Sequence, residues 1–182
     1  NYRISSLLLD GHGRTYDAFK AAKWEDWNNA IIKEYNKLDS LGYKKISFVG
    51  SSTGCTLLLE LVSSGFFNSK NPENIFFVDP NIVSSIKAQS MVGILGPMVV
   101  YIDTEPIDGE EKYWYRFRPY ETINELNELM KKVRQDLEDG FKLPQGTNLK
   151  VFQSRYDPVA SSTGSVLIYK GLKNADGSNI EV

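Results

Sequence analysis

Residues 46–62 read ISFVGSSTGCTLLLELV and combine a short apolar run, a turn rich in glycine and serine, and a longer apolar segment. The turn GSSTG at residues 50–54 fits the pattern G-x-S-x-G, and it lies between a predicted strand and a predicted helix. In that context a serine becomes an exposed nucleophile at a helix N-terminus, and the next backbone N–H helps to hold an oxyanion. Ser52 is therefore the candidate catalytic nucleophile, and the backbone N–H of Thr53 is the candidate oxyanion donor.

This interpretation requires a strained backbone at the central serine and glycines on both sides that let strand and helix approach closely. Two other interpretations remain open. The serine or threonine could simply cap the following helix, or the turn could bind a phosphate group at the helix N-terminus. The P-loop pattern itself is not matched, because no Gly-Lys-Ser/Thr sequence follows the turn.

The apolar run before this turn has counterparts along the chain. Residues 4–9, 74–78 and 149–153 are short apolar runs that end at turn residues, which is typical of buried strands. Helical patterns lie between and after them, over residues 24–38, 55–62, 121–138 and 161–171. Strands that alternate with helices predict the α/β class, with a mostly parallel sheet and helices on both faces.

One long segment interrupts this alternation. Residues 1–80 and 121–182 are predicted to form the core, and residues 81–120 between them show no strand alternation. The segment is rich in aromatic residues between Tyr113 and Tyr120. An insertion of this size on an α/β sheet is usually functional, so we predict a cap or lid. Its aromatic side chains either pack the cap onto the core or line an acyl pocket.

Aspartates follow two of the predicted strands. The carboxyl ends of parallel strands share one edge of a sheet, and ligands bind at that edge. Asp157, in the loop after residues 149–153, is therefore expected to face the same crevice as Ser52 and to orient a catalytic histidine. Asp79, directly after residues 74–78, is the alternative acid. An aspartate before proline is also a common turn residue without a catalytic role.

The sequence contains one histidine and one cysteine. His12 precedes Ser52, whereas a triad in this architecture runs in the order serine, acid, histidine. We therefore expect His12 to stabilise a loop or to line the crevice rather than to act as the base. Cys55 is expected to be a small buried hydrophobic residue, because no base partner for it is visible.

The composition excludes several classes of function. The formal net charge of -2 gives no overall basic field for nucleic acid. The longest apolar stretch, residues 91–102, is interrupted by two glycines and a proline and is shorter than the ~20 residues of a membrane span. A single cysteine allows no internal disulfide and is compatible with a reducing compartment such as the cytoplasm. The acidic residues show no metal-ligand spacing, so we expect no metal and no organic cofactor.

Taken together, these residues resemble the serine esterases of the α/β-hydrolase fold, in particular small bacterial carboxylesterases and monoacylglycerol-lipase-like enzymes. The resemblance rests on the G-x-S-x-G turn, on the loop Gly11-His12-Gly13 about forty residues before it, and on Asp157 after its strand. It covers most of the chain but is weak across residues 81–119. It implies Ser52 as the nucleophile, Asp157 as the acid and the Thr53 N–H as one oxyanion donor.

Three features differ from that family. Nothing before Asn1 supplies the family's His-Gly-aromatic loop, which provides the second oxyanion donor, and no histidine follows Asp157. Thr53 also stands where these enzymes often have a bulkier apolar residue. We therefore expect the chain to lack N- and C-terminal parts of a complete esterase and to have little or no activity by itself.

The resemblance implies acyl transfer to water through an acyl-serine, on short-chain or monoacyl lipid esters. Two alternatives from other classes stay open. One is a non-catalytic ligand-binding module on a hydrolase-like body, and the other is a phosphate- or nucleotide-binding doubly wound domain.

Overall fold

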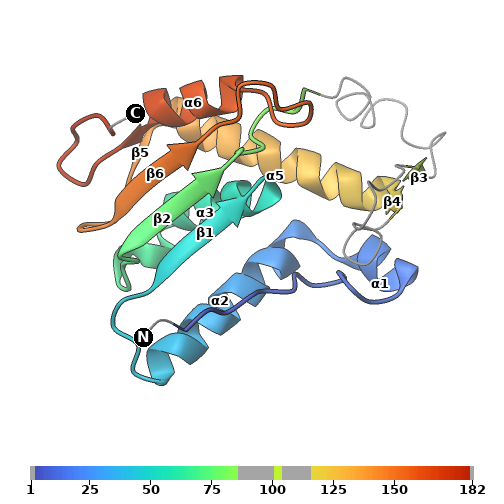
Figure 1. Ribbon diagram of the computed structural model, residues 1–182, viewed down its shortest axis with the longest axis horizontal. Coiled ribbons are helices and arrows are strands. Elements are labelled where there is room, and N and C mark those ends of the chain that lie inside the picture. Colours follow the sequence, from blue (N-terminus) through green and yellow to red (C-terminus); the bar gives the residue numbers. More distant parts are fainter. Residues whose placement is uncertain (1–2, 86–100, 104–115, 181–182) are drawn as a thin grey trace.

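Three parallel strands form the centre of the molecule. A computed structural model describes residues 3–85, 101–103 and 116–180 of the chain. The strands β1 (Ser47–Ser51), β2 (Asn74–Val78) and β6 (Asn148–Phe152) pair in the order β1-β2-β6 (Figure 1). The chain therefore belongs to the predicted α/β class, and its three parallel strands end at the same edge of the sheet.

Helices pack against one face of this sheet. The helix α3 (Thr53–Ser63) contacts β1 and also contacts both α2 (Trp24–Ser40) and α5 (Tyr120–Asp139). The helix can take this central place because it carries apolar side chains on all sides. Two of them, Leu57 and Leu59, are fully buried. The helices α2 and α5 are amphipathic and turn their apolar sides inward, as their sequence periodicity predicted.

The remaining core elements are short. They are α1 (Tyr16–Ala21), η1 (Phe66–Asn68), β5 (Phe141–Lys142), α6 (Thr163–Gly171) and β7 (Leu172–Lys173). The helix α6 packs against α5, and a Cβ atom at Gly171 would clash with the Leu137 carbonyl oxygen. Only glycine at position 171 allows the two helices to meet this closely.

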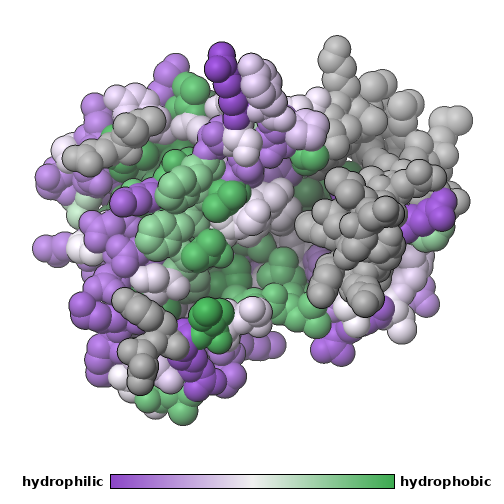
Figure 2. Space-filling view, viewed as in Figure 1, coloured by the Kyte–Doolittle hydropathy of each residue, from purple (hydrophilic) through white to green (hydrophobic). Residues whose placement is uncertain are grey.

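No described helix covers the opposite face of the sheet. Val49 is 73% exposed and Phe152 is 54% exposed, and both point away from the face that the helices cover. Phe76 and Val78 belong to the same face and are half-buried. Figure 2, seen from this side, shows hydrophobic residues gathered over the middle of the molecule. The described helices α2, α3 and α5 lie on the other face.

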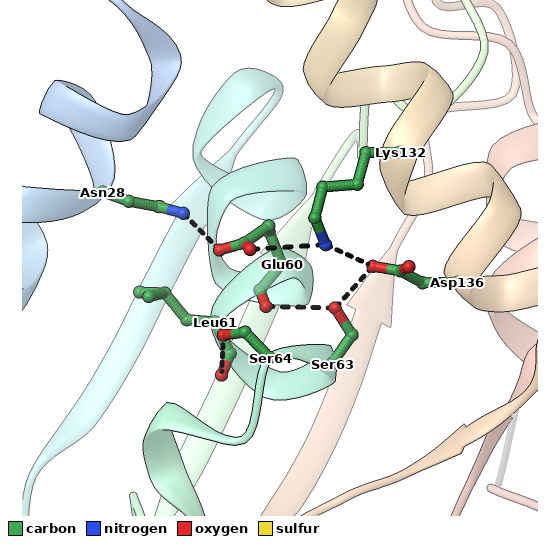
Figure 3. Close-up of polar contacts among 7 residues, drawn as sticks. All are labelled: Asn28, Glu60, Leu61, Ser63, Ser64, Lys132 and Asp136. Atoms are coloured by element: carbon green, nitrogen blue, oxygen red, sulfur yellow. Dashed lines mark hydrogen bonds and ion pairs between the residues drawn. The ribbon is translucent and has the colours of Figure 1, made fainter.

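A polar cluster joins α2, α3 and α5 within the helical layer (Figure 3). Glu60 of α3 is 6% exposed; its carboxylate accepts a hydrogen bond from Asn28 Nδ2 and lies 3.4 Å from Lys132 Nζ. Lys132 also pairs with Asp136 at 2.9 Å, and Ser63 Oγ donates to that carboxylate at 2.7 Å. Burial raises the pKa of Glu60, and the neighbouring Lys132 opposes this effect only in part.

Two sequence-based expectations differ from the structure. Residues 4–9 form no strand, because no described strand lies beside them to supply backbone hydrogen bonds, and Ile4 and Leu8 are exposed. The predicted cap contains an antiparallel pair, β3 (Tyr101–Asp103) with β4 (Phe117–Pro119), although no strand pattern was visible there. Most of that segment, including its aromatic residues 113–115, lies outside the described residues.

Candidate active site

Ser52 occupies the turn between β1 and α3 in a backbone conformation that is unusual for a residue other than glycine. Its φ is 50° and its ψ is −114°, a sparsely populated combination that is strained for an L-amino acid. Thr53 begins the helix, so its N–H has no acceptor within α3. The half-buried Ser52 side chain makes no hydrogen bond within the described ranges. The strained turn that the sequence pattern requires is therefore present.

The two glycines of the turn have different roles. A Cβ atom at Gly50 would lie 2.9 Å from both the Cys55 nitrogen and the Gly54 carbonyl carbon, so this glycine lets β1 and α3 approach closely. A Cβ atom at Gly54 would meet no described atom within 4 Å. The expectation that both glycines serve close approach thus holds for Gly50 and is wrong for Gly54, because no described atom lies close enough to a Cβ atom at Gly54 to exclude it.

The cysteine beside this turn belongs to the core. Cys55 is fully buried, and its Sγ lies 3.1 Å from the Gly50 carbonyl oxygen. Burial raises the pKa of its thiol to about 12. The small-hydrophobe interpretation of Cys55 is therefore confirmed, and the thiol is far from the thiolate state that nucleophilic attack needs.

The segment that leaves β2 supports the Ser52 turn. The Ser52 N–H donates to the Val78 carbonyl at 3.0 Å, and the Asn81 N–H donates to the Ser52 carbonyl at 3.4 Å. Thr56 of α3 adds a third bond, from its Oγ1 to the Asn81 carbonyl at 2.9 Å. The conformation of the candidate nucleophile thus depends on the last residue of β2 and on the residues that follow it.

Asp79, the first residue after β2, is also strained. Its φ is 48°, and its carboxylate points toward the end of β6. There Oδ1 accepts hydrogen bonds from the Ser154 N–H at 2.5 Å and from Gln153 Nε2 at 3.2 Å, and Oδ2 accepts one from Ser154 Oγ at 2.8 Å. Both carboxylate oxygens are therefore occupied by residues at the end of the next strand.

Asp157 lies five residues beyond the end of β6, at the same edge of the sheet. Its Oδ1 accepts hydrogen bonds from the N–H groups of Val159 and Ala160, at 2.7 and 2.8 Å. Its Oδ2 has no partner among the described residues. One oxygen thus anchors the side chain in its loop, and the other remains able to accept a further hydrogen bond.

Ser52 and Asp157 follow strands that both neighbour β2, so about 10 Å separates the two strand ends. No described hydrogen bond links the two side chains directly. In a catalytic triad an imidazole lies between the serine hydroxyl and the carboxylate and forms a hydrogen bond with each. The sequence-based expectation that both residues reach one edge is consistent with the strand order.

The sole histidine of the sequence is held away from this arrangement. The ring of His12 packs edge-on against Phe19, with 4.7 Å between ring centroids, and its Nδ1 lies 3.3 Å from the Asp10 carbonyl oxygen. Burial lowers the pKa of His12, with weaker opposition from hydrogen bonds to backbone carbonyls. It has no described contact with Ser52 or Asp157, in line with the expected loop role.

The described ranges lack a metal-binding cluster and a membrane-spanning helix. Within them, no group of three or more histidine, cysteine or acidic side chains is arranged to hold a metal ion. Likewise, among the described helices none combines the length and apolar character that crossing a bilayer requires.

The class of protein follows from comparison with known folds. No protein-family model and no curated protein matches the chain. Solved structures of lipolytic hydrolases match it over more than nine-tenths of its length. The chain has the α/β-hydrolase fold.

Three of these structures illustrate the similarity. A metagenome-derived lipolytic enzyme described with LipS and LipT has a TM-score of 0.74 at 17% identity, over 92% of this chain and 66% of its own. A soluble variant of monoglyceride lipase from Saccharomyces cerevisiae has a TM-score of 0.69 at 14% identity, over 92% and 63%. Monoacylglycerol lipase from Paleococcus ferrophilus has a TM-score of 0.63 at 15% identity, over 95% and 70%. The chain spans less than two thirds of the first two enzymes.

Sequence reasoning missed the residues that support the turn. Asn81, Gln153 and Ser154 were not singled out, because each is a polar residue in a loop without a recognisable motif. One available signal was positional. Polar residues that directly follow adjacent parallel strands lie side by side, so Asp79 could have been paired with Gln153 and Ser154 from the predicted strand ends alone.

Proposed function

We propose that Ser52 is the nucleophile of a serine hydrolase that cleaves carboxylic esters, with Asp157 as the acid of its triad. The observation that carries this proposal is the backbone of Ser52, which has a φ of 50° at a strand-to-helix turn. Such strain persists where function needs it, since a relaxed turn with a glycine would be less costly. It also sets the serine hydroxyl at the N-terminus of α3, where a developing negative charge is stabilised.

Asp157 suits the acid role better than Asp79 does. The carboxylate of Asp79 already accepts three hydrogen bonds from Gln153 and Ser154. Asp157 Oδ2 has no partner among the described residues, and two backbone N–H groups fix the side chain's orientation through Oδ1. An acid that orients an imidazole needs this combination of a fixed carboxylate and an available oxygen.

The proposed reaction is acyl transfer to water. Ser52 Oγ attacks the ester carbonyl carbon while a base takes its proton, and the tetrahedral oxyanion is stabilised by the Thr53 N–H. Collapse of this intermediate releases the alcohol, which takes up a proton, and leaves an acyl-serine that water then hydrolyses. Short-chain or monoacyl lipid esters are the proposed substrates, because the similar solved structures include monoglyceride and monoacylglycerol lipases.

His12 is not the proposed base, because its ring packs against Phe19 and has no described contact with Ser52. The base is proposed to be an imidazole from outside these 182 residues, so the chain alone should have little or no esterase activity. The phosphate-binding alternative has one donor fewer, because the Ser52 N–H already donates to the Val78 carbonyl.

A fluorophosphonate probe tests this proposal. The natural protein that contains this sequence should become labelled at Ser52, and the Ser52→Ala variant should not. The 182-residue chain should label slowly, and added free imidazole should accelerate labelling in proportion to its neutral form. If neither the natural protein nor the imidazole-treated chain is labelled at Ser52 while folded, the hydrolase proposal is wrong and the ligand-binding alternative is favoured.

A further inference from the structure

The residues that leave β2 contact both halves of the proposed site. Through main-chain bonds, Val78 and Asn81 hold the Ser52 turn on one side. On the other side, the Ser85 N–H donates to the Val159 carbonyl and the Ser161 N–H donates to the Val83 carbonyl, each at 2.8 Å. One segment, residues 78–85, therefore lies between the nucleophile turn and the loop of Asp157.

Asp79 is the charged residue of this segment, and its carboxylate crosses to the next strand. It binds the main chain and the hydroxyl of Ser154, which lies 75 residues later in the sequence. It also binds Gln153 Nε2, and the Gln153 carbonyl oxygen Oε1 accepts a hydrogen bond from Ser165 of α6 at 2.8 Å. The ends of β2 and β6 and the start of α6 are thus joined through the side chains of Asp79 and Gln153.

The backbone of Asp79 is positioned for this contact. Its φ of 48° is tolerated by aspartate and asparagine better than by most residues other than glycine. The same residue donates its N–H to the Phe152 carbonyl at 2.8 Å. Asp79 therefore meets the end of β6 with both its main chain and its side chain.

We propose that Asp79 is a positioning residue that keeps the Ser52 turn and the Asp157 loop in one fixed arrangement through its bonds to Ser154 and Gln153. This inference rests on the proposed function, since it assigns the two loops to one reaction. Asp79 does not touch the substrate in this proposal. It acts through the segment 78–81, which supports Ser52, and through Ser154, which leads into the loop of Asp157.

Two substitutions separate this role from that of a catalytic acid. The hydrogen bonds from Ser154 and Gln153 to Asp79 are here called the Asp79 clamp. Asp79→Asn keeps an oxygen to accept from the Ser154 N–H, and its amide can donate to Ser154 Oγ, so the clamp survives without its charge. Asp79→Gly removes the clamp and still allows the positive φ. Asp176→Gly is the matched control, because Asp176 binds the N–H and hydroxyl of Ser178 in a similar way, at the C-terminal turn.

In the natural protein, Asp79→Gly should lower kcat for a p-nitrophenyl ester by about 10- to 100-fold with little change in KM, because a small misplacement of reacting groups has effects of this size. Asp79→Asn should recover activity to within about 3-fold of the wild type, and Asp176→Gly should match the wild type. If Asp79→Asn is as inactive as Asp79→Gly, the charge itself is required and the positioning role is overturned. Wild-type activity in Asp79→Gly would overturn it as well.

Hydrogen exchange on the 182-residue chain tests the same inference without catalysis. Asp79→Gly should accelerate exchange both in residues 50–56 and in residues 154–161, and Asp79→Asn should not. If Asp79→Gly does not fold, Ser154→Ala, which removes one of the three bonds, should give the same two-segment pattern at smaller amplitude. Faster exchange in only one of the segments would overturn the coupling. Absence of Ser52 labelling with this exchange pattern intact would reject the proposed hydrolase and keep the clamp.

Discussion

Ser52 and Asp79 are the two residues other than glycine with a positive φ in the described ranges, and they directly follow the adjacent parallel strands β1 and β2. Two strained residues at one edge of a sheet are costly, at about 1–3 kcal/mol each. The two positions are also connected, because the Ser52 N–H donates to the carbonyl of Val78, the residue that precedes Asp79. The strain is therefore concentrated where the candidate nucleophile is held.

Relief of this strain should stabilise the fold. Ser52→Gly should raise the free energy of unfolding by about 1 kcal/mol, because the strain removed exceeds the added chain entropy of glycine. Ser52→Ala should give no such gain, since alanine is also strained at a φ of 50°. Urea denaturation of the two variants and the wild type measures this difference. Equal stabilities for the glycine and alanine variants would contradict a strained backbone at position 52.

Substitution by alanine should have opposite effects on the free energy of unfolding at Gly50 and at Gly54. Gly50→Ala should lower the free energy of unfolding by about 2 kcal/mol, because its Cβ would meet main-chain atoms of residues 54 and 55 at 2.9 Å. Gly54→Ala should be neutral or stabilising by up to about 1 kcal/mol, because the position is open and lies in a helix. Thermal or urea unfolding of both variants provides the test. A stable Gly50→Ala variant would show that β1 and α3 can separate without cost.

Glu60 should make stability depend on pH. Its raised pKa means that the folded chain binds the proton more tightly than the unfolded chain, so this contribution is fully present at low pH. It is lost as the pH rises from the unfolded value of 4.5 through the folded pKa. Glu60→Gln, which can still accept from Asn28, should therefore be more stable than the wild type at neutral pH, and the advantage should vanish in acid.

The control for this experiment is Glu128→Gln, which changes an exposed carboxylate on α5. Free energies of unfolding should be measured by urea titration between pH 4 and pH 8. Relative to the wild type, Glu60→Gln should become more stable as the pH rises, and Glu128→Gln should not. A Glu60→Gln variant that is less stable at neutral pH would mean that the ion pair with Lys132 outweighs the burial of the charge.

Cys55 should be unreactive while the chain is folded. With a pKa of about 12, its thiol is almost wholly protonated at pH 8, and burial also blocks access. Reaction with a disulfide reagent should be about 10³-fold slower than in urea-unfolded chain, where the thiol has an ordinary pKa. Absorbance of the released thiolate measures both rates. Rapid reaction without denaturant would show that the start of α3 opens readily.

The sheet and its main helices could be predicted from sequence because their signals are local. The runs at residues 74–78 and 149–153 are bounded by turn residues, and the structure places strands at these positions to within one residue. The run at residues 4–9 is also rich in apolar residues but forms no strand. Apolar composition shows that a segment can be buried, whereas a strand also needs a neighbour for its backbone groups.

The candidate site could be predicted only in part. The pattern around Ser52 indicates a strained turn, because the glycine and serine positions are fixed by local geometry. The clamp of Asp79 on Ser154 depends on a contact between residues 75 positions apart, and no short motif records it. That Asp157 Oδ2 has no partner in the described part of the chain, whereas both Asp79 oxygens have one, likewise becomes visible only when the loops are placed in space.

The side of the sheet that no described helix covers has a practical consequence for purification of this chain. Val49 and Phe152 expose apolar surface to water. The chain should therefore aggregate in concentrated solution and bind non-specifically to chromatography resins. A mild detergent should disperse such samples without denaturing them. A longer version or a companion protein that shields this side should stay clear without any additive.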